Sequence, residues 1–300
     1  MEKYSEADIS AIFAAVGFPD ETPQRSSEGF RNQVWLGERA VLKRYGEENR
    51  DGFRTEKWFY ETAHPTYAPK LLAVGEDWIL LERIHGTGLF RCWRDWTDAQ
   101  REAAVAQIAG IALSINEIDW SGAVAFLPYR AQYGKALVED IDRAAADLID
   151  SNAIPESLAR QVQEYAHRYA HLLDGAALHL VYNDLHFDNL LVEESGRIVL
   201  LDFEMLAIAP KDLVLDVWQR MLIHPFTYAN EEDHALTLPK DYTHLLTWMQ
   251  KSAPSLFAYP EIRRRVNLYA IWYELDLLRE FPRANWPIER LQTYLSETLW

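Results

Sequence analysis

The chain has 300 residues, of which 49% are hydrophobic and 25% charged, a composition typical of a folded globular protein. Its formal net charge of −16 at pH 7 disfavours nucleic acid or an anionic membrane as partner, because both need clustered Lys and Arg. The single cysteine, Cys92, excludes an internal disulfide. The start of the chain lacks a signal-peptide pattern and no apolar run approaches the roughly 20 residues of a membrane helix, so we expect a cytoplasmic protein.

The first part of the chain predicts a small antiparallel sheet with helices. Residues 5–17 have the spacing of an amphipathic helix, and residues 53–63 are also helix-like. Four runs are strand-like, and the first two are separated by a short turn that predicts a hairpin. These runs are residues 33–36, 40–45, 70–75 and 78–82.

The rest of the chain is predicted to be mainly helical. Thr97 is a good N-cap for a helix reaching about residue 118. Further helical patterns cover residues 131–150, 155–173 and the region after 213, with proline-containing loops near Pro225, Pro239, Pro254 and Pro282. A strand, loop and hairpin over residues 178–203 interrupt the helices, with a turn at residues 193–196.

The most informative segment is this interruption. It contains Asn183-Asp184-Leu-His186-x-x-Asn189 and, after the hairpin, Leu200-Leu-Asp202-Phe-Glu204. Phosphoryl transfer needs a carboxylate that orients the attacking hydroxyl and oxygen ligands for magnesium on the nucleotide phosphates. Asp184 fits the first role, and Asn189 with Asp202 fit the second. We expect His186 to support the loop rather than accept a proton.

These motifs resemble the catalytic and metal-binding segments of the aminoglycoside phosphotransferase and choline kinase family. One departure is Tyr182, which stands where the family usually has His. The resemblance implies an α+β, protein-kinase-like fold of two lobes. Residues 1–84 would form the nucleotide-binding lobe with its antiparallel sheet, and residues 85–300 the larger, mostly helical lobe for catalysis and acceptor binding. It also implies ATP or GTP as phosphate donor and Mg²⁺ as cofactor.

The resemblance extends to the nucleotide site. Lys43 in the second strand would contact phosphates and be held by Glu56 on the following helix, with Glu61 as the competitor for that partner role. Backbone groups of Glu82 and Ile84 would bind the adenine. In the loop before the first strand, the candidates for covering the phosphates are Gly29 and Asn32. Asp212 resembles an Asp that steadies the catalytic loop.

The acceptor site is harder to predict from the sequence. Tyr269, Trp272, Tyr273 and Asp276 share one helical stripe, and Glu274 lies on another face of the same helix. In relatives such residues line the acceptor pocket, and aromatic faces beside a carboxylate can hold an ammonium group. An aromatic stripe is also the usual pattern of a buried core, so both interpretations stand.

The sequence therefore predicts an ATP-dependent phosphotransferase acting on a small-molecule hydroxyl. The acceptor could be cationic, such as an aminoglycoside or amino alcohol, or thiamine, homoserine or a neutral sugar. A catalytically silent nucleotide-binding regulator of the same fold is the alternative from another class. A protein kinase is disfavoured because no Ala-Pro-Glu motif follows Asp202. No Gly-x-Ser-x-Gly elbow or His-Glu-x-x-His pair points to hydrolase chemistry. Oligomeric state is left open.

Overall fold

A computed structural model describes residues 5–26, 32–228, 234 and 237–296. The chain divides into two compact units. The first unit comprises residues 1–92, 121–127 and 187–206, and the second comprises residues 93–120, 128–186 and 207–300. The assignment of nucleotide binding to residues 1–84 concerns function and stays a prediction.

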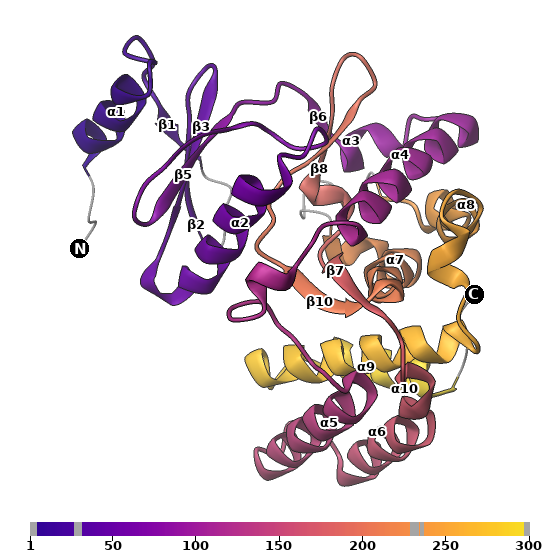
Figure 1. Cartoon of the computed structure of the whole chain (residues 1–300). Helices are drawn as coiled ribbons and strands as arrows, with labels where there is room; N and C mark the ends of the chain where they lie inside the picture. Colours follow the sequence, from indigo (N-terminus) through magenta and orange to yellow (C-terminus); the bar gives the residue numbers. More distant parts are fainter. Residues whose placement is uncertain (1–4, 27–31, 229–233, 235–236, 297–300) are drawn as a thin grey trace. The chain divides into compact units, whose positions relative to one another are not determined.

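A five-stranded antiparallel sheet forms the centre of the first unit, in the order β1-β2-β3-β5-β4 (Figure 1). The predicted hairpin is confirmed, since Val34 of β2 faces Lys43 of β3 in the register. The strands are β1 Gln24–Arg25, β2 Asn32–Leu36, β3 Ala40–Tyr45, β4 Leu71–Val74 and β5 Trp78–Glu82. The two-residue strand β1 was not predicted, because so short a run carries no periodicity.

The two faces of β3 have different neighbours. Ala40 and Leu42 belong to a buried apolar cluster with Ile9 and Phe13 of α1 (Glu6–Ala15). Lys43 and Tyr45 point the other way and meet α2 (Arg50–Ala63) through Glu56. Because side chains alternate along a strand, β3 presents an apolar row to one helix and a polar row to the other.

A second, three-stranded sheet in the first unit has the order β6-β8-β9. Its strands are β6 Thr87–Gly88, β8 Leu190–Val192 and β9 Ile198–Leu200, and the short helix η4 Phe187–Asn189 precedes β8. Register pairs Leu190 with Leu200, so the residues just before β8 and just after β9 leave the hairpin at the same end.

The second unit is mainly helical, as predicted. Thr97 caps α4 with a full capping box, in which its hydroxyl accepts from the Gln100 N–H and its own N–H donates to the Gln100 side chain. The helices α5, α6 and α9 pack on one another, and α10 packs on α6 and α9 (Figure 1). The helices are α4 Asp98–Asn116, α5 Tyr133–Asp150, α6 Glu156–Tyr169, α7 Val214–Ile223, α8 Leu245–Ser252, α9 Ile262–Glu280 and α10 Trp286–Ser296.

Shorter elements lie between the longer helices and strands of both units. The strands β7 Leu178–Tyr182 and β10 Leu206–Pro210 form a two-stranded sheet, and β10 was not predicted. The predicted loops at Pro225, Pro239 and Pro254 are instead single 3-10 turns, η6 Pro225–Tyr228, η8 Pro239–Tyr242 and η9 Pro254–Phe257. The other short helices are η1 Glu47–Asn49, α3 Leu89–Trp93, η2 Ser121–Ala123, η3 Ala170–Leu173 and η5 Lys211–Leu213. Among the described residues, none of the helices combines the length and apolar character needed to span a membrane.

Candidate active site

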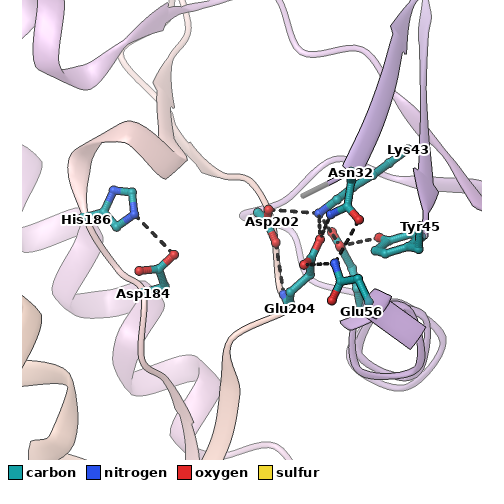
Figure 2. A network of polar contacts seen from close by, with 9 residues as sticks. Asn32, Lys43, Tyr45, Glu56, Asp184, His186, Asp202 and Glu204 are labelled. Atoms are coloured by element: carbon teal, nitrogen blue, oxygen red, sulfur yellow. Dashed lines mark hydrogen bonds and ion pairs between the residues drawn. The ribbon is translucent and has the colours of Figure 1, made fainter. Parts of the chain in front are cut away.

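The segment after β9 is anchored by Phe203. This side chain is fully buried and stacks on Phe59 of α2 at 4.0 Å between ring centroids, with Tyr60 edge-on at 5.4 Å. Its two neighbours, Asp202 and Glu204, both turn to Lys43 of β3 (Figure 2). The apolar residue of the Asp-Phe-Glu run thus fixes the two carboxylates in place.

Lys43 is the centre of a polar cluster in the first unit (Figure 2). Its ammonium lies 2.7 Å from Glu56, 3.0 Å from Asp202 and 2.5 Å from Glu204. The phenol of Tyr45, two residues further along β3, donates to the same Glu56 oxygen that Lys43 contacts, at 2.5 Å. The pairing of Lys43 with Glu56 is therefore a direct ion pair, whereas Glu61 lies on α2 beside Lys57 at 4.0 Å.

The cluster carries more negative than positive charge. Burial raises the pKa of Glu56 to about 7, even though Lys43 acts to lower it. For Lys43, burial acts to lower the pKa, but Asp202, Glu56 and Glu204 outweigh it and the pKa stands above its ordinary value. Carboxylate oxygens of Glu56, Asp202 and Glu204 lie within 4.8 Å of one another. One ammonium thus faces three carboxyl groups, a set suited to a second cation.

The backbone at Asp202 has a left-handed conformation. Its φ of +58° lies in the left-handed region, which residues other than Gly, Asn and Asp avoid. The side chain stabilises the turn by accepting from the Glu204 N–H at 3.1 Å. Asp202 is also the most exposed carboxylate of the cluster, with 40% of its side chain accessible.

Asn189 belongs to the same unit as Asp202. It ends η4, and its carbonyl accepts from the Leu201 N–H at 2.8 Å. This bond closes the open end of the β8–β9 hairpin and joins the two segments that carry the predicted metal ligands. The Asn189 side chain is half-buried.

Asp184 belongs to the second unit, in the turn after β7. Its carboxylate lies 3.3 Å from Nε2 of His186 (Figure 2), and the His186 N–H donates to the Asp184 carbonyl at 2.8 Å. His186 therefore contacts Asp184 through both ring and backbone, which matches the expected support of the loop. Tyr182, the departure from the family pattern, is buried at the end of β7.

Asp212 is fully buried in the second unit, and its partners are on α9. Both of its oxygens accept from Arg265 at 2.7 Å, and the Tyr269 hydroxyl donates to one of them at 3.3 Å. Arg265 also donates to the Leu172 carbonyl and lies over the Tyr259 ring at 4.1 Å. The pair thus ties η5 and η3 to α9.

The remaining nucleotide candidates lie in the first unit. The Glu82 N–H is engaged with the Lys70 carbonyl at 2.8 Å, and Ile84 follows β5 with its side chain half-buried. Asn32 opens β2 and donates to Glu204 (Figure 2). Gly29 lies outside the described residues.

The predicted acceptor residues on α9 differ in accessibility. Asp276 is exposed, Trp272 and Tyr273 are half-buried, and Glu274 is fully buried 3.5 Å from Arg290 of α10. Arg130 lies over the Trp272 ring at 5.6 Å and Arg220 over the Tyr273 ring at 3.4 Å. One face of each aromatic ring is thus covered by an arginine of the protein itself. Tyr269 belongs to the core, bonded to Asp212.

A family profile described as "Phosphotransferase enzyme family" matches residues 23–218, which contain every residue of the Lys43 cluster together with Asp184 and Asn189. The chain belongs to this phosphotransferase family. No curated protein matches this phosphotransferase in a sequence search.

Solved structures confirm the predicted fold. A streptomycin-ATP ternary complex of APH(2")-IIa matches with a TM-score of 0.68 at 14% identity, covering 98% of this chain and 97% of that one. The ADP-bound aminoglycoside phosphotransferase APH(2'')-Ib matches with a TM-score of 0.66 at 13% identity, covering 96% of each chain. A thermostable mutant of APH(4)-Ia with ADP and hygromycin B matches with a TM-score of 0.68 at 15% identity, covering 95% of this chain and 96% of that one.

Three residues of the Lys43 cluster and its surroundings were not predicted. Tyr45 could have been found, because it lies two positions after Lys43 on one strand and must share its face. Glu204 stands in the Asp-Phe-Glu run, and its spacing from Asp202 was the available signal. Asn49, which donates to both Glu204 and Asn32 at 2.7 and 2.9 Å, has no signal in the sequence, because its role depends on tertiary contacts.

Proposed function

We propose that the protein transfers the γ-phosphate of ATP to a hydroxyl group of a small molecule. The observation that carries the proposal is the buried Lys43–Glu56 pair at 2.7 Å, with Asp202 at 3.0 Å from the same ammonium. In kinase-type sites a paired lysine contacts nucleotide phosphates and an Asp holds the metal beside them. Membership of the phosphotransferase family supports the same chemistry.

Asp184 is proposed to orient the acceptor hydroxyl and take its proton. Its carboxylate is 36% exposed, so a substrate can reach it, and contact with His186 at 3.3 Å restricts its orientation. A positioned carboxylate of this kind serves as general base only within hydrogen-bond reach of the hydroxyl.

The donor set fits magnesium. Mg²⁺ favours carboxylate oxygens, and it is usually held by one or two of them together with waters and substrate phosphates. Asp202 is the accessible carboxylate of the cluster, Asn189 lies on the adjoining segment, and both would hold the ion. When bound, the ion would neutralise charge on the phosphate oxygens.

ATP is proposed as the donor, with GTP as the alternative. Ile84 and the carbonyl of Glu82, whose N–H is bonded to Lys70, would present backbone groups to the base, and Gly29 and Asn32 would lie near the phosphates. Among structurally similar proteins, one is described with ATP, others with ADP and one with GDP. The fold therefore accommodates both purines.

The acceptor is proposed to be a small molecule, and two chemistries are in competition. A cationic acceptor is supported by the net charge of −16 and by the exposed Asp276, and similar structures are described with streptomycin, gentamicin and hygromycin B. A neutral metabolite such as a sugar is supported by Arg130 and Arg220, which cover the Trp272 and Tyr273 rings. Glu274 is fully buried beside Arg290, so it would act on either acceptor only through its neighbours.

A coupled assay of ADP release across aminoglycosides, amino alcohols, amino sugars and neutral sugars tests the proposal. We expect turnover with one chemical group and none in the Asp184→Asn variant. Nucleotide binding without turnover on any acceptor would favour the silent regulator, and absence of nucleotide binding would refute the proposal.

A further inference from the structure

Glu204 joins three separate segments of the first unit. Its carboxylate lies 2.5 Å from the Lys43 ammonium and accepts from the side-chain amides of Asn32 and Asn49, the latter at 2.7 Å. Only 8% of the Glu204 side chain is accessible. The partners come from the first residue of β2, from the middle of β3 and from the residue before α2.

The two asparagines are also bonded to each other. The Asn49 amide donates to the Asn32 side-chain oxygen at 2.9 Å as well as to Glu204. Neutral amides fill acceptor positions on the carboxylate without cancelling its charge. Glu204 therefore keeps its attraction for Lys43 while its orientation is fixed from two sides.

Asn49 gives up a favourable local role to make these bonds. It precedes α2 and also ends the 3-10 helix η1, and its side chain makes no capping hydrogen bond, although Asn is among the preferred N-cap residues. A residue that departs from its local preference in this way points to a functional constraint.

We propose that Asn49 and Glu204 are positioning residues for the nucleotide. They fix the starts of β2 and α2 relative to the Asp202 segment, so that Lys43 is held where it meets the phosphates. Glu56 on α2 holds the Lys43 ammonium at 2.7 Å. Glu204, which follows Asp202, binds the same ammonium and sets the direction of the Lys43 side chain. This inference rests on the proposed function, because it presupposes that Lys43 contacts phosphate.

Two substitutions separate positioning from helix stability. Asn49→Ser and Asn49→Asp both retain a favourable N-cap residue. Ser is too short to replace the amide bonds, and Asp places a like charge beside Glu204. The matched control is Glu48→Ser, at the exposed neighbouring position.

The experiment is calorimetric titration of each variant with ATP, with and without MgCl₂, alongside a thermal melt. We expect the ATP dissociation constant to rise roughly 10-fold in Asn49→Ser, since a hydrogen bond to a charged group is lost, and further in Asn49→Asp. The melting midpoint should change little in Asn49→Ser and should fall in Asn49→Asp, because the added carboxylate joins a cluster that already carries excess negative charge. Glu48→Ser should bind ATP like the wild type.

Wild-type ATP affinity in both Asn49 variants would overturn the positioning role and leave the proposed function standing. A lower melting midpoint with unchanged affinity would show that the bonds serve stability alone and would also overturn it. Wild-type protein that binds neither ATP nor GTP would overturn the proposed function itself, and this inference with it.

Discussion

Two groups of charges in this protein differ in their balance of positive and negative charge. In the second unit, Asp212 and Arg265 form a two-bond pair at 2.7 Å, one charge of each sign. In the first unit, Lys43 faces three carboxyl groups, and Glu56 has an oxygen that lacks a hydrogen-bond partner. Burial penalises unpaired charge, so the balanced pair serves the fold, whereas the unbalanced cluster would be stabilised by the cation that we propose it binds.

Asp184 belongs to neither group and gives the sharpest contrast. Replacing it by Asn should lower the transfer rate by about 10²- to 10⁴-fold, the usual contribution of a general base. Nucleotide affinity and unfolding free energy should change little, because the side chain is partly exposed. Single-turnover kinetics, with the exposed Asp150→Asn as control, check this. Near wild-type transfer would remove Asp184 from the site.

Breaking the balanced pair should mainly affect stability. Arg265→Met leaves Asp212 buried without its charged partner, which typically costs about 3 to 5 kcal/mol. Urea unfolding measures the loss, and Arg263→Met, at an exposed position of the same helix, is the control. If the protein retains its stability, the contrast between the two groups of charges is wrong.

The unbalanced cluster should respond in the opposite way. Asp202→Asn tolerates the positive φ but removes one negative charge, so stability should hold or rise. Magnesium-dependent affinity for ATP should fall by about 10- to 100-fold or more, the loss seen even for groups that only support a metal ligand. Asn189→Ala should lose less, because a neutral amide contributes less charge. Unchanged calorimetric titrations for Asp202→Asn would exclude the metal role.

A third group of charges, around Glu274, tests whether burial alone makes an ionised carboxyl group destabilising. Burial raises the pKa of Glu274 from 4.5 to about 7, against the influence of Arg290 and Arg220. The folded protein therefore holds a proton that the unfolded chain releases, and stability should fall as pH rises from about 4.5 to 7.

Glu274→Gln should remove this part of the pH dependence and stabilise the protein at pH 8 by about 1 to 3 kcal/mol relative to the wild type. Unfolding at pH 5 and pH 8 measures it, with the exposed Glu280→Gln on the same helix as control. A wild-type slope retained in the Gln variant would mean that the Arg290 pair outweighs burial.

The sequence was sufficient for the fold because the signals were local. The capping box at Thr97, the alternation in β3 and the spacing of Asp184, Asn189 and Asp202 can all be seen within short windows. The short strands were missed for the opposite reason. β6 has two residues and pairs with β8 about one hundred positions later, as shown by Thr87 facing Val192.

Roles within the candidate site were predictable only in part. The pairing of Lys43 with Glu56 followed from strand-then-helix order, but the bonds from Asn49 to Glu204 span 155 positions. Helical periodicity placed Tyr273 and Glu274 on different faces of α9. It could not show that Arg220 and Arg290, from two other helices, would cover them.

The left-handed backbone at Asp202 limits the residues that can take its place. A residue with a Cβ pays roughly 1 to 2 kcal/mol there, and Asn, Asp and Gly are the types that escape most of it. Asn and Gly are therefore the two residues that this turn accepts most easily in place of Asp202. Either one would keep the turn while removing the carboxylate.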